Sequence, residues 1–228
     1  MAGLSKTTKV LLGLTLIGMI LSLYTAFIYA PTEKEMGHIQ RIFYFHMGSV
    51  WVATLAFVLV FIASIQYLRK GTRLWDILAY SSAEIGVIFL TLTIISGSIW
   101  AKISWNTWWT WDPQLTTTFL LWILFIAYLL LRSAAGSNLK KAKFCAVFGI
   151  IAFLDLPVMY ISTRVARGIS PVVFGGRGGG IAPRMMDALL VSLVSFTFLF
   201  LLLLQQRMNL EKMQDELERL VGERSIDG

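Results

Sequence analysis

The chain has 228 residues, of which 57% are hydrophobic and only 14% are charged, and its mean hydropathy is +0.71. Soluble domains carry roughly 25% charged residues, so this composition excludes a soluble domain of any size and indicates an integral membrane protein. The net charge of +7 does not indicate nucleic-acid binding, because basic residues in membrane proteins mostly mark cytoplasmic loops.

Six apolar segments fill almost the whole chain. A membrane-spanning helix needs about 20 predominantly apolar residues, and such segments lie at about 10–30, 48–68, 79–101, 115–131, 144–162 and 186–205. The first segment has no convincing small-x-small cleavage site, so we interpret it as a retained span rather than a signal peptide. We predict an all-α, polytopic membrane bundle of six transmembrane helices, with residues 1–206 as the membrane domain.

Residues 207–228 form a charged tail in which apolar residues recur at helical spacing. They are Leu210, Met213, Leu217, Leu220 and Val221. This spacing predicts an amphipathic helix. Such a helix could lie on the membrane surface, pair with a partner helix or stand solvated, and the sequence does not choose among the three.

The distribution of Lys and Arg predicts the orientation. Six spans put both termini on one side, and that side carries 13 of the 20 Lys and Arg residues. The positive-inside bias therefore places both termini and the tail in the cytoplasm. A Trp-rich loop at 100–114 and an Arg- and Gly-rich loop at 164–184 then face outward.

The stretch 100–112 holds five of the eight Trp residues. One interpretation is an interfacial belt, because Trp is enriched at both membrane–water boundaries. The other is a broad aromatic shelf for a flat ligand, since belts usually place one or two aromatics at each helix end rather than five in one loop.

The outward loop at 164–184 carries Arg164, Arg167 and Arg177, with Arg184 at its end, against the positive-inside bias. Lipid headgroups are one explanation. The other is an anionic ligand, because a guanidinium grips a carboxylate with two parallel hydrogen bonds. The Gly-rich run at 174–180 lacks the Lys-Ser/Thr of a phosphate-binding loop, so we interpret it as a flexible outer loop.

His46 lies just before the second predicted span, on the same outer side. A lone His near a membrane face is commonly a hydrogen-bonded structural residue. Flat aromatics, an imidazole and guanidiniums together nevertheless describe a haem site. The macrocycle would stack on Trp, the iron would take a nitrogen of His46, and Arg would hold the propionates.

The carboxylates of Glu84 and Asp155 lie well inside predicted spans. Ionisable groups in a span are costly and suggest function by default, so each is a hydrogen-bonding partner or part of a polar pathway. Glu84 lies about 24 Å from Trp100 along a helix, too far to touch a ligand at the loop. The single Cys, Cys145, allows no internal disulfide and is assigned to packing.

The segment Trp105-Asn-Thr-Trp-Trp-Thr-Trp-Asp112, followed by Leu115-Thr116, resembles the Trp-rich "WWD" signature of haem-handling membrane proteins. Its close form is similar to that of the cytochrome c maturation protein C family, also called haem exporter protein C. Further likeness lies in residues 41–46, 83–86 and 97–100, so the resemblance covers most of the chain.

The resemblance implies a function. A protein of this family is not an enzyme. It holds haem b as cargo at the outer, periplasmic face of a bacterial inner membrane. It passes the haem to a membrane-anchored haem chaperone, with help from ATP-driven transporter subunits, for c-type cytochromes. The partners expected are those proteins and lipid, and not nucleic acid. His46 would ligate the iron, and the other contacts would come from Trp100, Trp105, Trp108, Trp109, Trp111, Asp112, Arg164, Arg167, Arg177 and Arg184.

The chain departs from the family pattern at two positions. Ser170 stands where the family places a second axial His, and Gln114 stands where a basic residue is usual. The other His of the chain, His38, lies about 12 Å from His46 by helical rise, too far to clasp the same iron. A Met, a water or a partner protein could supply the second ligand, or the iron could be five-coordinate.

Two alternative functions stay open at this point. One is a membrane enzyme acting on haem or a quinone, with Glu84 and Asp155 as a proton path. The other is a structural subunit of a transporter, in which the Trp-rich loop is a docking surface.

Overall fold

A computed structural model describes residues 5–135, 139–165 and 181–226, and in them the regular structure is helical. Strands are absent from these residues except for one isolated bridge between Glu33 and Gly37. The all-α prediction is confirmed. The α-helices are α1 (Lys6–Tyr24), α2 (Ile42–Lys70), α3 (Arg73–Trp105), α4 (Pro113–Ala135), α5 (Leu139–Phe153), α6 (Asp155–Val165) and α7 (Pro183–Ile226). A π-helix, η1 (Thr25–Tyr29), extends α1, and a 3₁₀ turn, η2 (His38–Arg41), precedes α2.

The described residues contain six helical stretches long and apolar enough to cross a membrane, as predicted. They are Lys6–Tyr29, His38–Lys70, Arg73–Trp105, Pro113–Ala134, Ala142–Ser162 and Pro183–Gly222. A helix in a bilayer satisfies its own backbone hydrogen bonds, which is why an apolar chain of this kind is built of helices alone.

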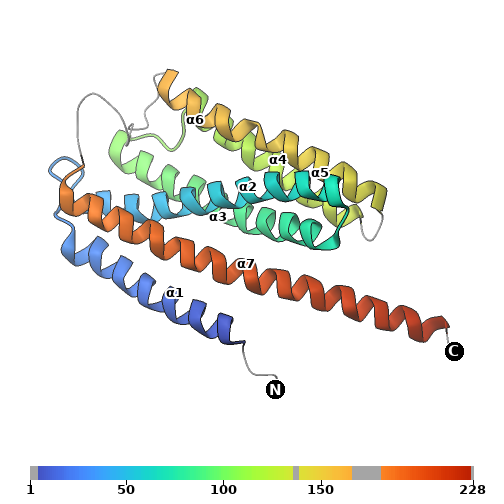
Figure 1. Cartoon of the computed structure of the whole chain (residues 1–228). Coiled ribbons are helices and arrows are strands. Elements are labelled where there is room, and N and C mark those ends of the chain that lie inside the picture. The colour runs from blue at the N-terminus through green and yellow to red at the C-terminus, as the bar shows by residue number, and fades with distance from the viewer. Residues whose placement is uncertain (1–4, 136–138, 166–180, 227–228) are drawn as a thin grey trace.

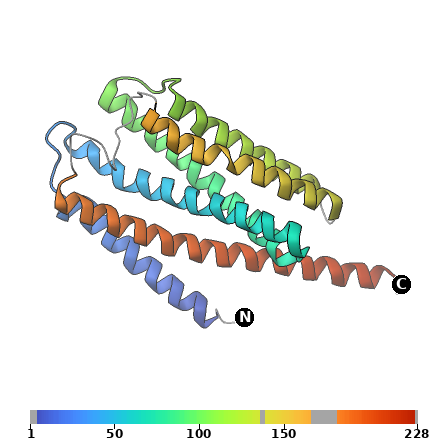
Figure 2. The same ribbon diagram turned by 45° about the horizontal axis from the view of Figure 1, so that its top comes forward.

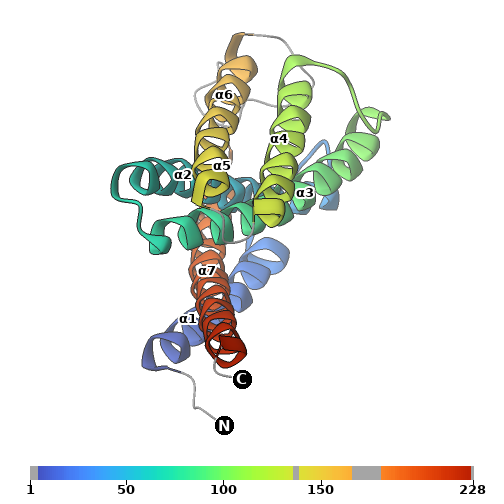
Figure 3. The ribbon, with the colours of Figure 1, turned by 90° about the vertical axis from the view of Figure 1, so that its right-hand side faces the viewer.

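The helices form a central hairpin with one group of helices on each side of it (Figure 1). The hairpin is α2 and α3, which pack along most of their length. One side of the hairpin is covered by α4, α5 and α6, and the other by α7 with α1 beside it, an arrangement seen from the end in Figure 3. The loop 106–112 and the turn at 30–37 lie at one end of the bundle, and the α2–α3 turn lies at the other.

The hairpin is tight because of two glycines. Gly71 ends α2 in the left-handed conformation, with φ of 66°, and its N–H bonds to the carbonyl of Tyr67. Gly86 of α3 lies against Phe57 of α2, where an added Cβ would come 2.5 Å from the ring. Phe57 stacks in turn on Phe125 of α4, with ring centroids 3.8 Å apart. The core therefore centres on the face shared by α2, α3 and α4.

The Trp-rich stretch is not a single loop. The prediction that the loop begins at Trp100 is wrong. Helix α3 continues to Trp105 and ends at Asn106, which has φ of 54°. Asn tolerates this left-handed conformation better than most residues, so it stops the helix there. The connection to α4 is thus the loop 106–112.

The fifth span is broken rather than continuous. Helix α5 ends at Phe153 and α6 begins at Asp155. Pro157 has no backbone N–H to give to Phe153, and its ring crowds that carbonyl, which accounts for the break. Asp155 is buried at the break.

The charged tail continues α7 without interruption. Forty-four residues at 1.5 Å per residue give a helix of about 66 Å, against a hydrocarbon thickness of about 30 Å. The far end of α7 accordingly projects past the other helices (Figures 1 and 2). All five apolar residues of the tail stripe are exposed on it.

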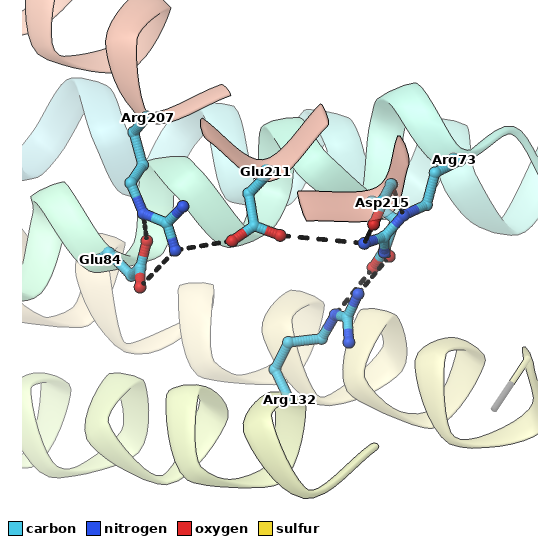
Figure 4. A network of polar contacts seen from close by, with 7 residues as sticks. Arg73, Glu84, Arg132, Arg207, Glu211 and Asp215 are labelled. Carbon is cyan, nitrogen blue, oxygen red and sulfur yellow. Dashed lines mark hydrogen bonds and ion pairs between the residues drawn. The ribbon is translucent and has the colours of Figure 1, made fainter. Parts of the chain in front are cut away.

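A network of charged side chains ties α7 to the hairpin at the end opposite the loop 106–112 (Figure 4). Arg132 of α4 grips the buried carboxylate of Asp76 with two hydrogen bonds of 3.1 and 2.6 Å. Arg73 contacts the same carboxylate and reaches Asp215 of α7 with two more, of 2.8 and 2.7 Å. Such bidentate pairs fix direction as well as distance.

Glu84 belongs to the same network, which resolves one question the sequence left open. Its carboxylate pairs with Arg207 of α7, whose guanidinium also contacts Glu211 at 2.7 Å. Glu84 is therefore a structural ion-pair partner between α3 and α7. The sequence placed it near this end but gave no sign of the partner, because 123 residues separate the two.

Replacing Asp76 with Ala removes the carboxylate that the buried Arg132 grips, and breaking one side of a buried ion pair typically costs about 3–5 kcal/mol. We expect Asp76→Ala to lower the thermal unfolding midpoint in detergent clearly. Glu218→Ala, which removes an exposed carboxylate of α7, is the control and should change little. The double variant Asp76→Leu/Arg132→Met should recover most of the loss. Equal midpoints for the two single variants would contradict the prediction.

Candidate functional site

A cavity of about 460 Å³ lies between α2, α3, α4, α6 and the loop 106–112. Its size is in the range of small-molecule sites, about 300–1,000 Å³. Its lining is mostly apolar and aromatic, and includes four of the five Trp residues of the stretch, which are Trp100, Trp105, Trp108 and Trp109. The structure thus brings these residues together with His46, which also lines the cavity.

His46 lies in the second turn of α2, held against α3. Its Nδ1 is 3.0 Å from the hydroxyl of Ser96, and that hydroxyl donates its own proton to the carbonyl of Leu92 at 2.6 Å. Ser96 therefore accepts from Nδ1–H, which leaves Nε2 as the unprotonated nitrogen. A His that ligates a metal commonly has its other nitrogen held in this way.

Two residues of α3 close around the imidazole. A Cβ added at Gly97 would stand 3.1 Å from Cε1 of His46, so the glycine lets the ring lie close to the helix. One turn further on, Trp100 meets the imidazole edge-on, with ring centroids 6.0 Å apart. Both contacts limit how far the ring can turn.

Trp100 is a buried residue, with only 7% of its surface exposed, and not part of an open shelf. Its Nε1–H donates to the sulfur of Met36 at 3.3 Å, and the hydroxyl of Ser104 donates to the same sulfur at 3.5 Å. Met36 belongs to the turn after η1, where the carboxylate of Glu33 accepts from its N–H at 2.5 Å. That bond and others from neighbouring backbone N–H groups hold the pKa of Glu33 below its usual range.

The loop 106–112 supplies the outer wall. Trp108 is 59% exposed, whereas the Nε1–H of Trp109 is buried and has no acceptor among the described residues. A buried donor without a partner costs free energy, so an acceptor on a ligand would be stabilising there. Gln114 also lines the cavity. It is the residue that the sequence analysis found at a position where a basic residue is usual.

Two predicted contacts in the loop 106–112 lie outside the cavity lining. Trp111 is 71% exposed and meets Trp109 edge-on at 5.9 Å. Asp112 caps α4, accepting from the N–H of Leu115 at 3.0 Å and from the hydroxyl of Thr110 at 2.7 Å. Pro113 then occupies the first helical position, which suits its fixed φ. Asp112 therefore holds the end of the loop at the start of α4 and does not itself line the cavity.

The Arg residues are only partly located. The guanidinium of Arg184 lies over the ring of Tyr29, 5.7 Å from its centroid, and Arg184 is not in the lining. The side chain of Arg164 and residues Arg167, Ser170 and Arg177 lie outside the described residues.

The lining also contains residues that the sequence analysis missed. Met47 and Thr54 of α2 line it, with Met159 and Tyr160 of α6. The signal was weak, because apolar faces toward lipid, toward the core and toward a cavity have the same helical period. Neither Glu84 nor Asp155 is in the lining, and the described residues hold no cluster of three or more His, Cys, Asp or Glu that could bind a metal ion.

The comparisons with known proteins all lead to proteins described by haem export or cytochrome c biogenesis. The family model described as "Heme exporter protein C" matches residues 1–222. A "Heme exporter protein C" of Bradyrhizobium diazoefficiens is 27% identical over 83% of this chain and 72% of its own length. The protein of the same description from Haemophilus influenzae is 26% identical over 90% and 85%. A "Cytochrome c biogenesis protein CcsA" of Prochlorococcus marinus is 42% identical over 35% of this chain and 26% of its own.

The match over nearly the full length agrees with six spans and a Trp-lined cavity at one end of the bundle. The chain is a multi-pass membrane protein of the haem exporter protein C family, a family of transport proteins and not of enzymes.

Proposed function

We propose that this chain holds haem b in the cavity beside the loop 106–112, with Nε2 of His46 on the iron, and delivers it for cytochrome c maturation. Membership of the family supports a role in cytochrome c maturation, with haem as the cargo. The observation that carries the finer proposal is the His46–Ser96 hydrogen bond, which leaves a metal-binding nitrogen on a residue that lines a Trp-rich cavity.

The cavity suits a flat, largely apolar macrocycle. Its Trp side chains offer faces for stacking, and its volume is that of a small-molecule site. Haem also carries two carboxylates. The unpartnered Nε1–H of Trp109 is a donor for one of them, and Gln114 offers a second polar contact. We assign Arg164, Arg167 and Arg177 to the propionates too, and Arg184 only if it leaves Tyr29.

No second His lines the cavity among the described residues. We propose that iron bound by His46 is five-coordinate and leaves its other face for a ligand from the receiving protein. Bis-His ligation holds haem strongly, so a single protein ligand favours release.

The charge distribution of the sequence supports an outward-facing cavity, with the termini and the projecting part of α7 in the cytoplasm. We propose a bacterial inner membrane as the location, with the cavity on the periplasmic side. A membrane-anchored haem chaperone would receive the haem there, and ATP-driven transporter subunits would contact the chain elsewhere. Residues 1–206 would act as the membrane domain and 207–228 as the cytoplasmic tail.

His46→Ala tests the iron ligand, and His38→Ala is its matched control, as the other His of the chain. We expect protein purified after growth with ample haem to show a high-spin Soret spectrum. His46→Ala should lose most of the bound haem, and His38→Ala should keep it. A colourless wild-type protein, or equal haem content in the two variants, would rule out the proposed ligand.

Trp109→Leu and Trp111→Leu separate stacking in the cavity from a general interfacial role. Both residues lie in the same loop, but only Trp109 lines the cavity. We expect Trp109→Leu to speed haem loss to apomyoglobin. A nucleobase stacked on an aromatic side chain is worth about 1–3 kcal/mol, and the haem ring would stack on Trp109 in the same way. Trp111→Leu should change the rate far less. Similar rates for both would favour an interfacial belt.

Single-Cys labelling tests the orientation. In a Cys145→Ala background, Lys34→Cys lies at the cavity end and Ser133→Cys near the opposite end, and both positions are exposed. We expect an impermeant thiol reagent to label Lys34→Cys in intact spheroplasts and Ser133→Cys only after permeabilisation. The reverse pattern would invert the proposed topology.

A further inference from the structure

The cavity extends from the loop deep into the apolar interior. Its inner end is lined by Phe57 of α2, Leu90 of α3, Leu121 of α4 and Leu156 of α6. Thr54, which also lines it, is eight residues beyond His46, about 12 Å further along the helix. The cavity therefore reaches the depth of the hydrocarbon region of the bilayer, well below the loop 106–112.

One wall of this cavity is made by partly exposed residues of α2 and α6. Val50 and Thr54 of α2 are half-buried, and Tyr160 and Ile161 of α6 are 44% and 60% exposed. All four line the cavity. Among the described residues, these side chains are where α2 and α6 meet along the cavity. We call this row of residues the α2–α6 seam.

A hydrogen bond closes the seam. The hydroxyl of Thr54 donates to the carbonyl of Val50 at 2.8 Å, so it accepts the proton of the Tyr160 hydroxyl, which lies 2.9 Å away. Helix α6 packs mainly on α4 and α5 rather than on α2. The interruption of the helix at Leu154 separates α6 from α5, so a shift of α6 need not bend α5.

We propose that haem enters this cavity sideways from the bilayer, through the α2–α6 seam, and that the Thr54–Tyr160 hydrogen bond is the latch of this entrance. The proposal rests on the proposed function, since haem is the ligand. Haem is a mostly apolar macrocycle that partitions into bilayers. With a lateral entrance, the apolar faces of haem stay out of water until the iron reaches His46. The loop 106–112, at the outer end of the cavity, is then left for transfer of haem to the receiving protein.

The test joins the two helices across the seam. In a Cys145→Ala background, the double variant Thr54→Cys/Tyr160→Cys is treated with a short bifunctional thiol reagent. The matched control is Trp51→Cys/Thr197→Cys, which joins α2 to α7 at a side-chain contact of the same length, 2.9 Å. Each protein, in lipid vesicles, receives haem from haem-loaded vesicles, and the growth of the Soret band gives the loading rate.

We expect cross-linking across the seam to slow loading about tenfold or more, as closing a gate does. The α2–α7 cross-link and a monofunctional thiol reagent on the seam pair should leave the rate nearly unchanged. Tyr160→Phe, which removes only the latch hydroxyl, should load faster than the wild type.

Equal rates with and without the seam cross-link would overturn the lateral entrance, and so would equal slowing by both cross-links. An unchanged rate for Tyr160→Phe would overturn the latch. A wild-type protein that never acquires a Soret band would overturn the proposed function itself, which is a different outcome from a slow rate.

Discussion

The close contact of α2 with α3 at His46 is the constraint on which the site depends. Gly97 leaves room for the ring, and Ser96 holds Nδ1, so the imidazole is fixed by two successive residues of one helix. Ser96 makes both bonds at once. Its hydroxyl proton goes to the carbonyl of Leu92, and its oxygen stays available to His46, so no polar group of this pair is left without a partner. The cavity wall is rigid at His46, as the proposed iron ligand requires, because a metal ligand must be placed to within a fraction of an ångström.

The opposite end of the hairpin is fixed by charge. Asp76 and Glu84 of α3 take three Arg side chains between them, from α3, α4 and α7, and these ion pairs hold the projecting part of α7 in one direction. The contacts of α6 with the hairpin are of another kind, with a hydrogen bond between the uncharged hydroxyls of Tyr160 and Thr54. The same bundle thus has a firmly held half and a half that can yield, and the cavity lies between the two.

The sequence predicted the spans well, because six apolar runs in a bilayer leave little choice. It predicted one site for His46 and five Trp residues, and the structure brings His46 and four of these Trp residues to one cavity. It predicted less well what depends on pairing between distant residues. The Glu84–Arg207 pair, the capping role of Asp112 and the burial of Trp100 under Met36 all depend on which helix faces which. Apolar periodicity carries no such information, since lipid and protein core select the same residues.

Under the proposed function the chain must bind haem and release it, and these two demands would act on different atoms of the cavity. The α3 side of the cavity is built for retention, with His46 and Trp100 held in place by hydrogen bonds and close packing. The α6 side offers apolar contacts and the Thr54–Tyr160 hydrogen bond, which the proposed opening would break. If entry uses the α6 side, the exposed Trp108 and the loop around it need not move for loading, and their motion is reserved for release. Separate routes for entry and exit would make delivery directional without any change at the iron ligand.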